Sequence, residues 1–173
     1  LLAMQFHTSA YLLLALYPLY HANITKKWLW FVVPCIIAVF AFRSTIFSLL
    51  AQFLWREYGT IQETGATTIL VLLILFAVYS YLITDDEKID RDAIAMRNIL
   101  LLSIVLQFFV MLNPVAMRVN YYFLIFVPIL IPKVAACCKK RYTQLARLSV
   151  IVMTAYFMLY FINNYFNFIS LAF

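Results

Sequence analysis

The chain has 173 residues, of which 66% are hydrophobic and only 12% are charged, and its mean hydropathy is +0.95. A soluble domain has about half apolar and about a quarter charged residues, so this composition excludes an ordinary soluble domain and indicates an integral membrane protein. The net charge of +6 requires no nucleic acid, because basic loops beside a lipid bilayer account for it.

Six apolar stretches predict helices that cross the membrane, since about 20 helical residues (about 17–25) span a hydrocarbon core of roughly 30 Å. They are Leu2–Tyr20, Trp28–Phe42, Thr67–Ile83, Ala95–Leu112, Val119–Ile131 and Leu145–Ile162. The second and fifth are short and must extend into their flanks. The alternating pattern of a barrel is missing, so we expect an all-α bundle of about six spans, with residues 1–173 as one transmembrane domain. The opening Leu1-Leu2-Ala3, with no Met, predicts that the chain is a segment of a longer protein.

The basic residues indicate how the spans are oriented, because cytoplasmic loops retain Lys and Arg. Ten of the 13 Lys and Arg residues follow the first, third and fifth stretches: Lys26, Lys27, Lys88, Arg91, Arg97, Lys133, Lys139, Lys140, Arg141 and Arg147. That side is predicted to be cytoplasmic, and both ends of the chain are then outside.

The predicted cytoplasmic face offers little chemistry. Its densest charged run, residues 85–92, alternates acidic and basic side chains and is expected to be a solvated loop. Cys35 lies inside a span, whereas Cys137 and Cys138 lie in a loop. Without a Cys-x-x-Cys pair, these cysteines predict neither a disulfide framework nor a zinc site.

The outer face keeps Arg43, Arg56 and Arg118, where Lys and Arg are normally scarce. Glu57 and Glu63 are the only acids on that face, so the arginines exceed them by one positive charge. Because guanidinium groups bind phosphate oxygens in pairs, this surplus favours an anionic ligand such as a phosphate. The alternative is that Arg43 and Arg56 bind no ligand and only extend their charged groups to the water at the membrane surface.

The segment after Arg43 is amphipathic. Apolar residues at 46, 49, 50, 53 and 54 share one helical face, and polar residues at 44, 48, 52 and 56 share the other. This pattern predicts a helix lying in the outer interface, or a tilted continuation of the second span. The following loop carries both glycines of the chain, Gly59 and Gly65, and can bend around a ligand.

Two short motifs resemble the EpsG family of Wzy-like exopolysaccharide polymerases. The first is Phe6-His7-Thr8-Ser9-Ala10 before a long apolar helix. The second is Arg118-x-x-Tyr121-Tyr122-Phe123, with Ile131-Pro132 downstream. The resemblance implies a multi-pass protein of the bacterial cytoplasmic membrane that transfers glycans linked to undecaprenyl diphosphate on the outer face. It also implies that this chain is the C-terminal portion, roughly half, of such a longer multi-span protein. Other polysaccharide assembly proteins are further candidate partners.

The resemblance also suggests roles for the outer polar residues. Arg43 and Arg118 are the leading ligands for the lipid diphosphate, with Arg56 secondary and Tyr121 beside them. His7 is the first candidate for the general base, with Glu57 and Glu63 as alternatives, although a lone intramembrane histidine also fits a simple interhelical hydrogen bond. No cofactor is expected, because the lipid diphosphate already activates the donor. The predicted outer loops contain no Asp-x-Asp motif, which favours a reaction without a metal ion. A transporter or flippase component and a nonenzymatic scaffold of an export complex remain as alternatives.

Overall fold

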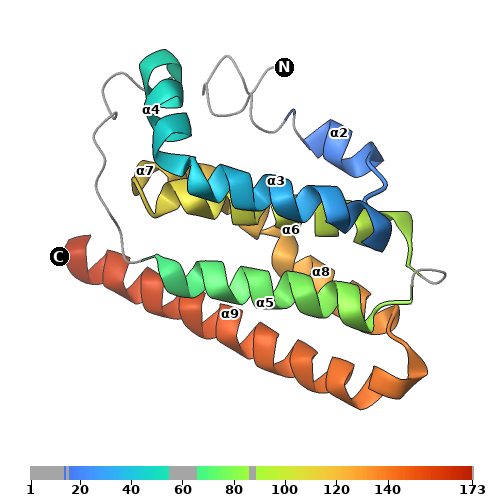
Figure 1. Ribbon diagram of the computed structural model, residues 1–173. Helices are drawn as coiled ribbons and strands as arrows, with labels where there is room; N and C mark the ends of the chain where they lie inside the picture. Colours follow the sequence, from blue (N-terminus) through green and yellow to red (C-terminus); the bar gives the residue numbers. More distant parts are fainter. Residues whose placement is uncertain (1–13, 15, 55–65, 86–88, 173) are drawn as a thin grey trace.

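The computed structural model describes residues 14, 16–54, 66–85 and 89–172, and within these ranges the regular elements are helices (Figure 1). In chain order they are α2 (Leu16–His21), a 3₁₀ helix (Lys26–Trp28), α3 (Leu29–Ala41), α4 (Arg43–Leu54), α5 (Thr67–Ile83), α6 (Arg91–Val110), α7 (Val115–Leu124), α8 (Phe126–Ala136), a second 3₁₀ helix (Lys140–Tyr142) and α9 (Thr143–Ala172). The predicted all-α class is confirmed.

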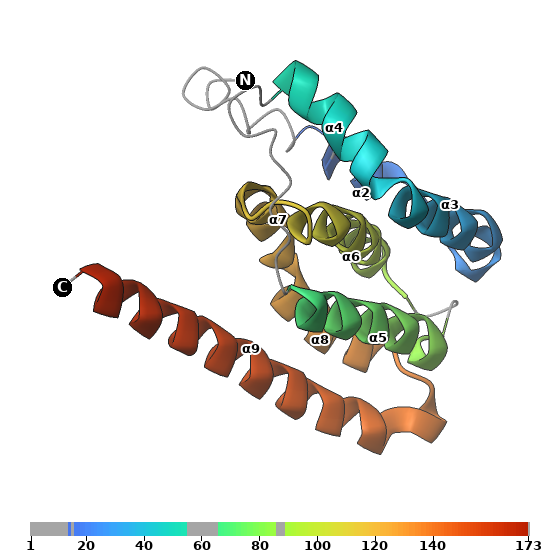
Figure 2. The same cartoon turned by 60° about the vertical axis from the view of Figure 1, so that its left-hand side comes forward.

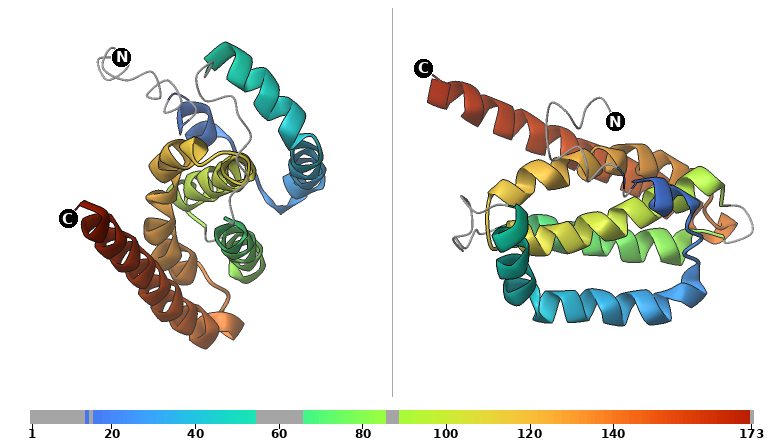
Figure 3. Two further views of the ribbon diagram at one scale, coloured as in Figure 1. Left: turned by 90° about the vertical axis from the view of Figure 1, so that its left-hand side faces the viewer. Right: turned by 90° about the horizontal axis from the view of Figure 1, so that it is seen from above.

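Helix α6 is the centre of the bundle. It contacts α2, α3, α4, α5, α7 and α8, and 13 of its 20 residues are buried. Figure 2 shows it between α3 and α5, and the end-on view in Figure 3 shows the other helices around it. Helix α9 lies on the outside, where it packs along α8 and its Ser149 hydroxyl hydrogen-bonds the hydroxyl of Tyr79 on α5.

Local chemistry sets several helix ends. The Asp90 carboxylate accepts a hydrogen bond from the Ala93 N–H at 2.8 Å and caps the start of α6. The Asn113 side chain does the same for Val115 N–H at the start of α7. The regular helical hydrogen bonding is interrupted at Ile125, between α7 and α8, because Pro128 has no N–H to donate to the carbonyl of Leu124.

The described residues contain fewer clear spans than the sequence predicts. By length and composition, two helices can cross a membrane, Arg91–Val110 and the run Val115–Ala136, or three if Lys26–Ala41 and Arg43–Leu50 form one bent span. Helix α5 is apolar but has only 17 residues. About six spans are therefore not confirmed, and the first predicted stretch lies largely outside the described residues. The 22-residue run Val115–Ala136 does extend the short fifth stretch on both sides.

The chain bends by 73° between α3 and α4. The residue at the bend, Phe42, leaves helical geometry with φ −99° and ψ 13°, and α4 then departs steeply from the direction of α3 (Figure 1). The predicted amphipathic segment after Arg43 is thus a separate helix, and not a straight continuation of the second stretch.

A buried polar network joins α6 to α7 and to the start of α5. The Ser103 hydroxyl donates to Asn120 Oδ1 at 2.7 Å, Asn120 Nδ2 donates to Gln107 Oε1 at 2.7 Å, and Gln107 Nε2 donates to the carbonyl of Ala66 at 3.1 Å. The three side chains are all 0% exposed. Since a buried polar group without a partner is costly, the network fixes how these three segments pack.

We expect Asn120→Leu to lower the free energy of unfolding by about 1–3 kcal/mol, because it leaves Ser103 and the Gln107 carbonyl without their partner. Adding Gln107→Leu should cost less than the sum of the single changes, since both sides of the contact are then apolar. Denaturant unfolding of the detergent-solubilised protein measures these values. The exposed Asn23→Leu is the control and should stay within about 0.5 kcal/mol; equal effects at positions 23 and 120 would contradict the expectation.

Candidate functional site

Three of the seven predicted site residues lie in the described part of the chain: Arg43, Arg118 and Tyr121. The other four lie outside the described residues, namely His7, Arg56, Glu57 and Glu63. Arg43 stands on α4, and Arg118 and Tyr121 stand on α7.

Arg43 sits at the bend between α3 and α4. Its guanidinium donates to the carbonyl of Phe40 at 3.0 Å and lies 4.4 Å from the centre of the Phe40 ring. It therefore contributes to the shape of the bend as well as carrying a charge. Among the described residues, Arg43 has no ion-pair partner, and its Nε is buried without a hydrogen bond.

Arg118 and Tyr121 stand on α7 with exposed side chains, and 42% of the Tyr121 surface is accessible. Arg118 likewise has no carboxylate partner within the described ranges. On the same helix, Ala116 and Val119 are buried and Asn120 belongs to the polar network. The helix is thus anchored on one side while Arg118 and Tyr121 remain available on the other.

One hydrophobic cluster brings the elements of both arginines together. Phe47, one turn after Arg43 on α4, is 2% exposed and packs with Phe109, Val110, Leu112 and Ala116. Met117, the neighbour of Arg118, and Ala66 pack against the same cluster. Ala66 is the first described residue after the segment that carries Arg56, Glu57 and Glu63. We call this end of the bundle the arginine end.

The opposite end, which we call the lysine end, holds the loops that the sequence predicts to be cytoplasmic. The Lys26 Nζ donates to the carbonyl of Thr84 at 3.1 Å, and the backbone N–H of Lys139 donates to the carbonyl of Ile83 at 3.0 Å. Segments far apart in the sequence therefore meet at one end of the bundle, which agrees with the prediction that their basic loops lie on the same side of the membrane. These contacts do not show which side that is.

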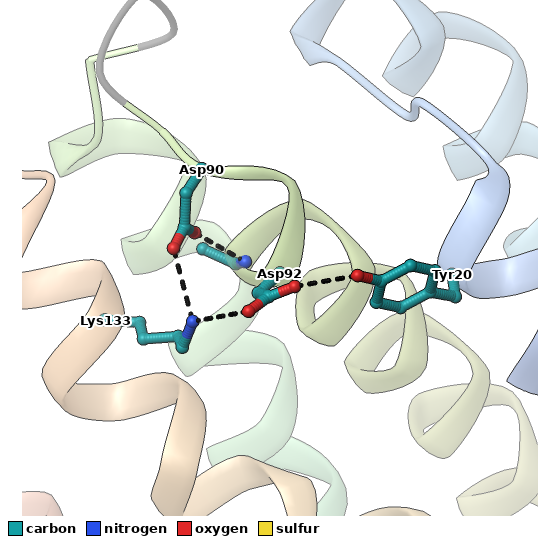
Figure 4. Close-up of polar contacts among 5 residues, drawn as sticks. Tyr20, Asp90, Asp92 and Lys133 are labelled. Carbon is teal, nitrogen blue, oxygen red and sulfur yellow. Dashed lines mark hydrogen bonds and ion pairs between the residues drawn. The ribbon is translucent and has the colours of Figure 1, made fainter.

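Within the charged run that the sequence predicts as a solvated loop, the described residues Asp90 and Asp92 form specific contacts (Figure 4). The Lys133 Nζ lies 3.2 Å from Asp90 Oδ2 and 3.1 Å from Asp92 Oδ2, and the Tyr20 hydroxyl donates to Asp92 Oδ1 at 2.9 Å. These contacts connect α2, α6 and α8. Alternating charges in the sequence give no indication of such contacts, because Lys133 is 41 positions from Asp92.

The structure corrects the placement of Arg97. The sequence counts it as a loop residue, but α6 starts at Arg91, so Arg97 lies within the helix and is only 1% exposed. Its guanidinium donates to the Thr84 hydroxyl at 3.2 Å and lies 4.3 Å from the centre of the Tyr81 ring. The capping pattern at Asp90 would have indicated the earlier helix start.

No group of three or more His, Cys, Asp and Glu residues in the described ranges could hold a metal ion. Arg43 on α4 and Arg118 on α7 place two guanidinium groups at the arginine end of an apolar helical bundle. Two guanidinium groups on a fixed support are suited to bind an anion, and not to coordinate a cation.

These features define a membrane protein built from packed helices, with two arginines, Arg43 and Arg118, at one end. The chain belongs to the EpsG family, which it matches over residues 1–172, essentially its whole length. No match is found among curated proteins or among solved structures. Family membership assigns the chain a role in polysaccharide biosynthesis.

The orientation is testable by cysteine labelling. In a background with Cys35, Cys137 and Cys138 replaced, we expect Thr45→Cys at the arginine end to react with a membrane-impermeant maleimide on intact cells. Lys140→Cys at the lysine end should react only after the membrane is opened, because basic loops remain cytoplasmic. The reverse pattern would place the arginines in the cytoplasm.

Proposed function

We propose that this chain is part of a membrane polysaccharide polymerase. It would join oligosaccharide units linked to undecaprenyl diphosphate, at the outer face of the bacterial cytoplasmic membrane, during exopolysaccharide or capsule biosynthesis. The observation that carries the proposal is the arginine end, where Arg43 and Arg118 stand on helices that pack on one hydrophobic cluster. Membership of the EpsG family supports the same conclusion.

In the proposed reaction, the bond between the sugar's anomeric carbon and the diphosphate oxygen of the donor breaks. A hydroxyl of the acceptor sugar forms the new glycosidic bond, and its proton passes to a base. The lipid diphosphate leaves with increased negative charge. Arginines already held in place stabilise that charge without reorganising during the reaction, which lowers the barrier.

Arg118 is suited to this role because the helix beneath it is fixed while its side chain is exposed. Asn120 anchors α7 to α6, and the buried Val119 and Ala116 hold the same side of the helix. Arg43 would contribute from the bend of α4. In this proposal Arg56 gives secondary support, and Tyr121 contacts the substrate beside Arg118.

The acceptor hydroxyl requires a base within hydrogen-bond reach. His7 is our first assignment, because its unperturbed pKa lies close to neutral pH, with Glu57 and Glu63 as the alternatives. The donor is already activated by its diphosphate, so the reaction as proposed requires no further cofactor.

The decisive experiment is reconstitution of the complete protein with its lipid-diphosphate-linked repeat units, followed by gel analysis of the products. We expect a ladder of polymers from the native protein, and a rate at least about 100-fold lower from Arg118→Ala, since one preorganised donor to a developing anion contributes about 10²–10³. Arg118→Lys should recover little of the lost polymerisation rate, because an ammonium group lacks the paired donors of a guanidinium.

The matched control is Arg141→Ala, which removes an exposed arginine at the lysine end. It should leave the ladder unchanged. If the native protein produces no ladder with the correct substrate, but moves lipid-linked units across the membrane, a transporter or flippase is the correct function. If it does neither, a scaffold role remains.

His7→Gln tests the assignment of the base. We expect turnover to fall by about 10²–10⁴, the usual contribution of a general base, with substrate binding little changed. The loss of turnover at acidic pH, which in the native protein would report protonation of His7, should also be absent from this variant. A variant that retains normal turnover would exclude His7 and direct the search to Glu57 and Glu63.

A further inference from the structure

An apolar groove of about 710 Å³ lies between α3 and α5, with α6 at its floor. The end-on view in Figure 3 shows α3 and α5 on the same side of α6. The two walls are helical rows of residues four positions apart: Leu29, Val33 and Ile37 on α3, and Ile74, Val78 and Leu82 on α5. Each row presents one continuous apolar edge, because side chains four apart lie on the same helix face.

The groove opens towards the surroundings of the bundle. Among the wall residues, Ile37 is 61% exposed and Leu82 is 66% exposed, whereas the floor residues Leu101 and Ile104 are 8% and 3% exposed. In a protein that lies in a membrane, such a groove faces hydrocarbon. A concave apolar surface of this kind offers an extended chain more contact than a flat one.

The polar lining gathers at one end. Lys26 and Lys139 line the groove where α5 ends, and backbone carbonyls at Ile83 and Thr84 hold both residues there. Tyr81 also lines this end, and the guanidinium of Arg97 lies over its ring. Two lysines, Lys26 and Lys139, therefore line the end of a groove whose remaining lining is largely apolar.

The dimensions fit one leaflet. The wall rows run from Leu29 to Ile37 and from Ile74 to Leu82, and eight residue steps cover about 12 Å of helix at about 1.5 Å per residue. Half of a hydrocarbon core of roughly 30 Å is about 15 Å. An acyl chain beginning at the lysine end would thus extend along the groove to about the depth of its own leaflet.

From this arrangement we infer that the groove is a binding site for an anionic phospholipid of the leaflet at the lysine end. The phosphate lies between Lys26 and Lys139, and one acyl chain lies between α3 and α5. This site is at the opposite end of the bundle from Arg43 and Arg118. It does not depend on the proposed polymerase function.

Binding can be measured by native mass spectrometry of the complete protein, titrated with phosphatidylglycerol in detergent. We expect Lys26→Gln combined with Lys139→Gln to weaken binding by about 10- to 30-fold, the effect expected of two lysines beside an anionic lipid. The matched control is Lys27→Gln with Lys140→Gln, which removes the same charge from exposed neighbours outside the groove and should change binding by less than about twofold.

A second pair of variants tests the groove without changing charge. Val78→Trp fills the space between the two walls and should reduce retained lipid as strongly as the lysine pair. Val71→Trp places the same bulk on an exposed position of α5 that does not line the groove, and should bind lipid normally. Circular dichroism and elution volume confirm that each variant is folded.

Three outcomes would overturn the inference. Equal losses in both lysine pairs would indicate only a general charge effect. Normal lipid binding with a lower melting temperature in Lys26→Gln/Lys139→Gln would mean that the lysines only stabilise the end of α5. A photoreactive amino acid at position 78 that crosslinks to protein, and not to lipid, would show that another helix occupies the groove.

Discussion

Four buried polar side chains of α6 each bind a different part of the bundle, and the arrangement of the helices depends on them. Arg97 binds Thr84 at the end of α5, and Asn98 donates to the carbonyls of Leu19 and Ala22 at 2.8 Å, which holds the end of α2. Ser103 binds Asn120 on α7, and Gln107 binds Ala66 before α5. Inside an apolar environment no water can replace these partners, so each contact restricts where the partner segment can lie. Apolar packing alone would permit the helices to slide and rotate against one another far more freely.

The two ends of the bundle differ in how their charged side chains are paired. At the lysine end, acids and bases from distant segments pair with each other, as Lys133 does with Asp90 and Asp92. At the arginine end, the described cations Arg43 and Arg118 have no such partners in the described ranges, while the apolar residues around them are tightly packed. Arginines that stand on packed helices, with no carboxylate partner in the described ranges, are suited to bind an anion. At the lysine end, the ion pairs of Lys133 join α6 to α8, whereas Lys26 and Lys139 line the apolar groove.

The candidate site could be predicted from the sequence only in its residue types and its side of the bundle. Arg43 and Arg118 are conspicuous because the sequence predicts them on the outer face, where basic residues are scarce, and the motif that resembles the EpsG family includes Arg118 and Tyr121. Their support could not be predicted. Ser103, Gln107 and Asn120 look like ordinary polar residues in apolar stretches, and only packing shows that they form one chain of hydrogen bonds. Arg43 also contacts Phe40, three positions earlier, across the bend at Phe42.

The sequence by itself determined the membrane location, the helical class, the family and the separation of basic residues into two groups. Each of these follows from composition, local periodicity or short motifs, which need no knowledge of distant contacts. The tertiary structure decided which predicted stretches are continuous helices, that the chain bends by 73° before α4, and that Arg97 is buried inside α6. It also decided that α3 and α5 leave an apolar groove ending at Lys26 and Lys139. These features arise from contacts between residues tens of positions apart, and such contacts leave no local pattern in a single sequence.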